Sequence, residues 1–144
     1  MSITSCYDAL CTVIANGVGA KSRYTSIPNT PPQRLPAVVV SWVNTAPASQ
    51  VFSSVVGSKI TRNAMRRIHA FDVTVIVGMT GMIKDEDTAG RTAAQSLLDA
   101  IDDDVELSGA CVYSQVENIS QSLTEWDGQA MFAVRARVSV MEDV

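Results

Sequence analysis

The chain has 144 residues, the size of one ordinary domain, and its 47% hydrophobic and 18% charged residues are typical of a globular protein. Its net charge of −4 argues against a protein dedicated to nucleic acid, which usually carries a basic stripe. No apolar run approaches the ~20 residues of a membrane-spanning helix, and the first residues show no secretory signal, so we expect a cytoplasmic protein.

The three cysteines and the single histidine do not fit a disulfide framework or a zinc site at ordinary spacings. Cys6 and Cys11 are five residues apart on a predicted helix and therefore point to different sides. Cys111 lies far along the chain, at the start of a predicted strand. We interpret all three as buried free thiols that pack as small hydrophobic groups, and we predict no metal and no cofactor.

The first part of the chain predicts a helix, a connector and a strand. Apolar residues at three- and four-residue steps indicate a helix over residues 4–16, ended by Asn16-Gly17. The prolines of Ile27 to Pro36 favour a stiff surface connector; a ligand for an SH3-type partner is the less favoured alternative. A strand is predicted over Ala37 to Asn44, with apolar residues on both faces.

The middle of the chain predicts an arm and a long strand. Residues 45–64 hold many Ser, Gly and Asn residues and few large apolar ones, so we predict a mobile arm that becomes ordered against a neighbouring molecule. The strand from Arg66 to Met79 alternates with a period of two, with Phe71 and Val73 on its apolar side and Asp72 opposite.

The last part predicts a helix and a closing hairpin. The helix covers Asp85 to Asp104, and Gly90 within it costs up to ~1 kcal/mol relative to alanine unless close packing recovers that loss. Its apolar face consists of Ala94, Leu97, Leu98 and Ile101. Strands over Val112 to Leu123 and Ala130 to Met141 flank an Asp-Gly turn within 125–128. These elements predict a single α+β domain: one mainly antiparallel or mixed sheet of four to five strands with helices packed on it.

No set of residues suggests catalysis. His69, the one histidine, lacks a recognisable nucleophile and carboxylate around it, and its parity with Phe71 places it at the end of the core face or at the rim of the sheet. We therefore predict a structural role for His69. The segment Gly78 to Gly81 lacks the Lys-Ser/Thr ending of a phosphate loop. We predict that the protein is not an enzyme.

Charged residues are the better candidates for contacts. A basic segment precedes the long strand. Two arginines alternate on one face of the last strand, and that face can equally be an ordinary solvated surface or an interface with another molecule. The predicted interface residues are Lys59, Arg62, Arg66, Arg67, Arg135 and Arg137. An acidic run lies where the helix dipole disfavours it, without the spacing of a calcium loop. This run consists of Asp102, Asp103, Asp104 and Glu106.

The order of these elements resembles that of the tail terminator proteins of long-tailed bacteriophages, also called tail-to-head joining or tail-completion proteins. The resemblance spans nearly the whole chain: a short helix, a proline-containing crossover, the strand at Leu35 to Val40, a long arm, the strand at Arg66 to Val77, an acidic helix and a hairpin. It implies a virion protein that forms a ring of six at the head-proximal end of the tail tube, stops tube polymerisation and joins the tail to the head.

The resemblance also implies partners and a place of assembly. The partners are other copies of the chain, the tail tube protein and a head-completion or connector protein, and assembly takes place in the host cytoplasm. DNA passes through the ring without being read, and an acidic lumen would suit that passage. The charge asymmetry between residues 59–67 and 85–106 suits head-to-tail contacts between identical subunits.

Two other classes stay open from the sequence. A head-closure or neck protein of the same particle has a similar pattern. A small non-enzymatic ligand-binding α+β domain would need an apolar pocket dotted with polar groups.

Overall fold

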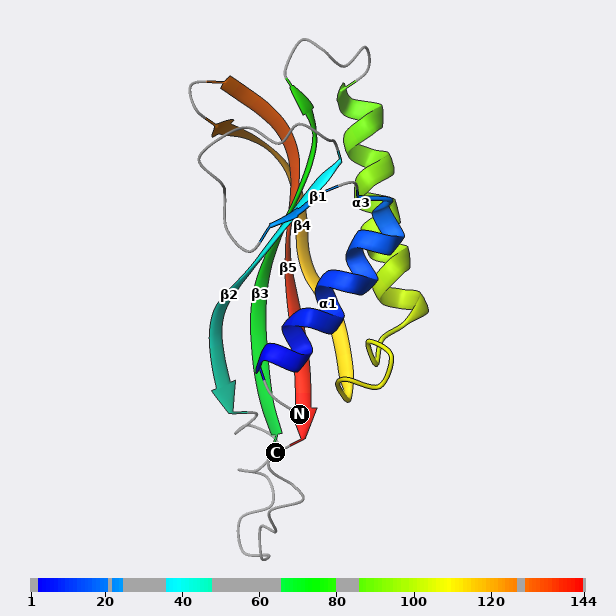
Figure 1. Cartoon of the computed structure of the whole chain (residues 1–144), viewed down its shortest axis with the longest axis vertical. Helices are drawn as coiled ribbons and strands as arrows, with labels where there is room; N and C mark the ends of the chain where they lie inside the picture. The colour runs from blue at the N-terminus through cyan, green and yellow to red at the C-terminus, as the bar shows by residue number, and fades with distance from the viewer. Residues whose placement is uncertain are drawn as a thin grey trace, which may run out of the picture.

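In the computed structural model, two helices lie on one face of an open sheet (Figure 1), which confirms the predicted α+β class. The structure describes residues 3–20, 22–24, 36–47, 66–79, 86–126 and 129–143. The elements are α1 (Ile3–Val18), β1 (Ser22–Tyr24), β2 (Ala37–Pro47), β3 (Arg66–Met79), α3 (Glu86–Asp103), β4 (Tyr113–Trp126) and β5 (Gln129–Asp143). No helix in these ranges is long and apolar enough to cross a membrane.

The sheet has the strand order β1-β2-β3-β5-β4. β1 runs parallel to β2, and the other neighbouring pairs are antiparallel. The predicted long strand is confirmed with the same bounds, and the two strands of the closing hairpin are confirmed but longer than predicted. Residues 127–128, which hold the predicted turn, lie outside the described ranges. β1 was not predicted, because three residues are too few to show a period.

The main core lies between the helices and the sheet. Leu10 and Ile14 of α1, Leu97 and Ile101 of α3 and Phe71 of β3 are fully buried there. A smaller apolar cluster lies on the opposite face, since its members alternate along β2 and β5 with residues of the main core. This second cluster consists of Ala37, Val39, Ile76, Met131 and Ala133.

The end of α1 differs from the prediction. The helix continues through Asn16-Gly17 and ends before Gly19, which has a φ of 66°. The amide of Ala20 then donates to the carbonyl of Ala15 at 2.9 Å, the hydrogen bond that closes a helix at a left-handed residue. The left-handed position therefore ends the helix, two residues later than expected.

Two glycines inside helices allow close packing. A Cβ on Gly17 would lie 2.3 Å from Ala100 Cβ, so Gly17 lets α1 approach α3 closely. A Cβ on Gly90 would lie 2.7 Å from Gln121 Nε2 and 2.9 Å from Phe132 Cε1, so Gly90 lets α3 approach the β4–β5 hairpin. The close packing expected to offset the cost of Gly90 is present.

The first three residues of the predicted arm lie in a strand instead. Thr45, Ala46 and Pro47 belong to β2 and pair with β3, so β2 is three residues longer than the predicted strand. The remainder of the arm, residues 48–64, and most of the proline-containing connector lie outside the described residues.

Candidate functional site

A chain of hydrogen-bonded polar side chains joins β2, β3 and β5 where β2 and β5 end and β3 begins, at the lower end of the sheet in Figure 1. His69 on β3 holds its Nδ1 2.6 Å from Thr45 Oγ1 on β2 and its Nε2 2.7 Å from Glu142 Oε1 on β5. The thiol of Cys6 on α1 has two possible acceptors, the carbonyl oxygen of Ala110 at 3.7 Å and the second carboxylate oxygen of Glu142 at 3.9 Å. Cys6 and His69 are fully buried, and Glu142 is 3% exposed.

The strand register brings these groups together. Thr45 lies directly opposite His69 on the neighbouring strand, and Val140 lies opposite His69 on the other side. Glu142 is two residues beyond Val140 and therefore on the same face of the sheet. The expectation that His69 is structural and lies on the core face agrees with its burial. The expectation that no carboxylate or thiol accompanies it is wrong, because both arrive from the opposite ends of the sequence.

The order of the groups does not suit nucleophilic catalysis. A catalytic cysteine needs a histidine beside its sulfur and a lowered pKa. Here the carboxylate of Glu142 stands between Cys6 and His69. Burial, followed by the charge of Glu142, raises the pKa of Cys6 to about 11, so the thiol stays protonated at neutral pH.

The buried chain of hydrogen bonds reaches the surface at Trp42. The indole Nε1 of Trp42 donates to Thr45 Oγ1 at 3.0 Å, and Trp42 is 50% exposed. Trp42 also borders a surface depression of about 350 Å³ together with Ile3 and Tyr7. The exposed Trp42 is therefore linked to the buried His69 through two hydrogen bonds.

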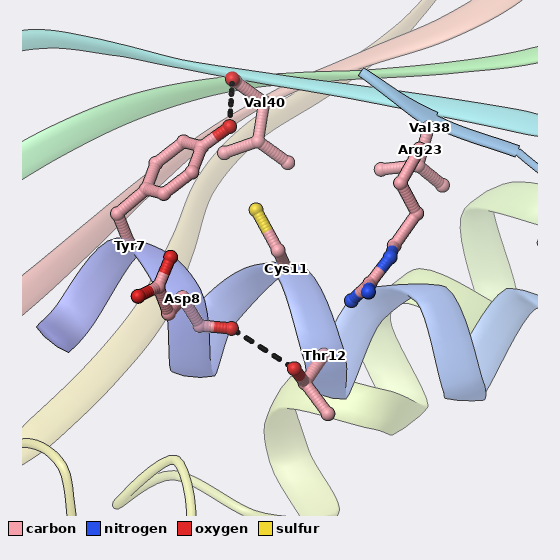
Figure 2. Close-up of a pocket in the computed structure, with 7 residues that line it drawn as sticks. All are labelled: Tyr7, Asp8, Cys11, Thr12, Arg23, Val38 and Val40. Carbon is pink, nitrogen blue, oxygen red and sulfur yellow. Dashed lines mark hydrogen bonds between the residues drawn. The ribbon is translucent and has the colours of Figure 1, made fainter. Parts of the chain in front are cut away.

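A second site lies between α1 and the β1–β2 edge of the sheet, where Figure 2 shows a pocket of about 340 Å³. The Tyr7 hydroxyl donates to the Val40 carbonyl at 3.0 Å and closes one side of the pocket. Cys11 points its sulfur toward the sheet, and the Arg23 guanidinium extends toward the helix from the other side (Figure 2). Among the described residues, the pocket is lined by Tyr7, Asp8, Cys11, Thr12, Arg23, Val38 and Val40.

The thiols differ in their surroundings. Cys6 and Cys111 are buried as predicted, and burial raises the pKa of Cys111 to about 12. Cys11 is only half-buried, so the prediction that it is buried is wrong, but its side chain does pack against the main core. Burial is still the main cause that raises the pKa of Cys11. Burial likewise raises the pKa of the neighbouring Tyr7 hydroxyl.

A third site is the face of the sheet opposite the helices. Arg135 and Arg137 lie on this face together, as their alternation predicted, and both border a depression of about 520 Å³. Arg137 Nε lies 2.7 Å from Asp72 Oδ1, and the two side chains are 40% and 38% exposed. Glu117 accepts a hydrogen bond from Ser139 at 2.6 Å beside them. Both charge signs therefore alternate on one open surface.

The other predicted contact residues are described only in part. Lys59 and Arg62 lie outside the described residues, and Arg66 opens β3 without a described side chain. Arg67 is exposed. The predicted basic segment thus stays a prediction.

The acidic run has a local role at one of its positions. Asp104 accepts hydrogen bonds from the Ser108 amide at 2.9 Å and from the Ser108 hydroxyl at 3.0 Å. Ser108 has a φ of 58°, so Asp104 stabilises a left-handed turn after α3. The other members, Asp102, Asp103 and Glu106, are exposed. An acidic lumen is not needed to account for Asp104.

Comparison with known protein families and curated proteins identified no relative of this chain. No protein-family model matches the chain, and no curated protein shows significant sequence similarity to it. Its function has to be inferred from the order of its elements and from the three sites described above.

Proposed function

We propose that this protein is a structural subunit that assembles with copies of itself into a ring, as its resemblance to phage tail terminator proteins implies. In this role six copies cap the head-proximal end of the tail tube, stop its polymerisation and connect it to the head. The partners are the tail tube protein and a head-completion or connector protein.

The observation that carries the proposal is the one-sided architecture of the domain. Both described helices cover one face, while the opposite face presents Arg135, Arg137, Asp72 and Glu117 around a depression of about 520 Å³. A surface that carries both signs can meet a complementary surface on an identical subunit. The half-exposed Arg137–Asp72 pair contributes little to stability, so its partners are free to change on assembly.

The edges of the sheet support the same proposal. β4 is a 14-residue edge strand, and β1 pairs with only the first three residues of the 11-residue β2. Over the described residues, one edge of each long outer strand therefore has no strand partner. Exposed edges pair readily with strands of another chain, and edges on opposite sides of one sheet suit head-to-tail rings.

The proposal is tested by mass and by binding to tails. Native mass spectrometry of the protein, alone and with purified tail tubes, should give a closed oligomer, six copies being expected. Electron microscopy should place that ring at one end of the tube only. A protein that stays monomeric at high concentration and leaves tube ends bare would refute the proposal. Binding to purified heads but not to tubes would instead identify the neck or head-closure class.

The pocket of Figure 2 favours a second candidate function, that of a small ligand-binding domain. Its apolar wall of Val38 and Val40 is dotted with the charges of Arg23 and Asp8, and its volume of about 340 Å³ falls in the range of small-molecule sites. A monomeric mass combined with a thermal shift from a small anionic compound, abolished by Arg23→Ala, would favour this candidate over the ring.

A further inference from the structure

We infer that Cys6, His69 and Glu142 bind one divalent transition-metal ion, with Zn²⁺ as the ion that suits this donor set. The three residues offer one sulfur, one nitrogen and one oxygen atom, and these atoms all lie within 4.8 Å of one another. All three residues are buried. This inference is separate from ring formation, since it concerns the inside of one subunit.

The spacing of the donor atoms is close to that of a zinc site. Zinc bonds of about 2.3 Å to sulfur and about 2.0–2.2 Å to nitrogen and oxygen put tetrahedral ligands about 3.3–3.6 Å apart. His69 Nε2 lies 2.7 Å from Oε1 of Glu142, and Cys6 Sγ lies 3.9 Å from Oε2 of the same carboxylate. With one donor atom taken from each residue, the three atoms lie within 4.8 Å of one another. To hold one ion, the widest of these spacings, at most 4.8 Å, would have to shrink by little more than about 1 Å.

The surroundings of His69 fit a metal ligand. Metal-binding histidines usually give their second ring nitrogen to a hydrogen-bond partner, which fixes the ring. Thr45 Oγ1, 2.6 Å from Nδ1, can accept that proton and leave Nε2 to face the carboxylate and the thiol. Phe71 packs edge-on against the imidazole, with ring centroids 6.4 Å apart, and restrains it further.

The charges of the site also favour a cation. A buried carboxylate is costly unless it is paired, and within the described part of the chain Glu142 meets one imidazole and one thiol. A divalent ion would balance the carboxylate and a thiolate together. Because the ligands come from α1, β3 and β5, the ion would fasten the first turns of the helix to the end of the sheet. With three protein ligands, the ion would keep a fourth coordination position, which a water molecule would fill.

The alternative is a histidine–glutamate pair that binds no metal and lies beside a protonated thiol. The two are separated by titrating untagged, full-length, metal-stripped protein with ZnCl₂ in a calorimeter, and with Co²⁺ as a probe whose absorption reports thiolate ligation. We expect one ion per chain and a rise in melting temperature with Zn²⁺, since binding to the folded state stabilises it. Cys6→Ser and Glu142→Gln should each lower the affinity at least tenfold.

Cys11→Ser is the matched control, because this residue is a second thiol of the same helix that lies outside the cluster. It should bind Zn²⁺ as the unmodified protein does. Absence of stoichiometric binding by the unmodified protein overturns the inference, whatever the variants do. Binding that survives Cys6→Ser and Glu142→Gln, or that is lost in Cys11→Ser, overturns it as well. If Cys6→Ser does not fold, Glu142→Gln decides, since it keeps the size of the side chain and a hydrogen-bonding group.

Discussion

The contact between α1 and α3 allows a quantitative test of the fold. Gly17→Ala places a Cβ 2.3 Å from Ala100 Cβ, far inside the distance at which two carbon atoms can pack. Forcing the helices apart should cost about 1–3 kcal/mol, while alanine recovers up to about 1 kcal/mol of helix propensity. The last turn of α1 is near the helix end and can yield partly. We therefore expect a net loss of about 1–2 kcal/mol in the free energy of unfolding.

The second substitution makes the test specific. In Gly17→Ala/Ala100→Gly the clashing Cβ is gone, and the next atoms, Ala100 Cα and Ser96 O, are both 3.5 Å from the new Cβ, an ordinary contact. The propensity changes at the two positions then cancel to within about 1 kcal/mol, so the double variant should be close to the unmodified protein. Urea unfolding followed by far-UV circular dichroism gives the four free energies of this cycle.

Two results would refute this reasoning. If Gly17→Ala is as stable as the unmodified protein, the helices are not in the described contact. If Ala100→Gly fails to rescue Gly17→Ala, the loss has another cause. Gly19→Ala is a useful control, because its φ of 66° makes the substitution unfavourable with no atom within 4 Å, so Ala100→Gly should not rescue it.

Further predictions concern the buried chain, the open face and the core. In urea unfolding, His69→Ala should lower the free energy of unfolding by about 3 kcal/mol, because it leaves a buried carboxylate without its partner. Arg137→Ala breaks a half-exposed pair and should lower it by less than about 1 kcal/mol in the same assay. Leu97→Ala should cost about 3 kcal/mol by calorimetry, because the side chain is fully buried. Arg66→Glu/Arg67→Glu should leave the melting temperature within a few degrees and reduce the joining of tails to heads; normal joining would remove the basic segment from the interface.

The regular elements were predictable because their signals are local. The period-two alternation of β3 and the apolar stripe of α3 are complete within their own sequences, and both elements were found within one residue of their bounds. β1 has only three residues and forms by pairing with residues 37–39, so its strand character comes from a partner rather than from its own pattern. The end of α1 was predicted too early because Gly17 was taken as a helix-ending glycine. In the structure Gly17 allows α1 to approach α3, and the sequence does not distinguish these two roles of a glycine.

The buried cluster was missed for a related reason. Cys6 and Glu142 are 136 residues apart, and only the pairing of β3 with β5 brings the carboxylate beside His69. The predicted strands ended at Asn44 and Met141, one residue short of the two partners of His69. Polar residues weaken the pattern of a strand at its ends. Thr45 and Glu142, the hydrogen-bond partners of His69, therefore made the ends of the two strands hard to recognise. Extending each strand by one residue would have placed a threonine and a glutamate on the face that holds the histidine.

The most direct test of the proposed function is to count the subunits bound to a tail. Purified tail tubes mixed with the protein should show a single ring of six copies at one end by electron microscopy, and they should stop elongating when more tube protein is added. Tubes that continue to elongate, with no added density at either end, would contradict the proposal that this chain terminates and joins tails.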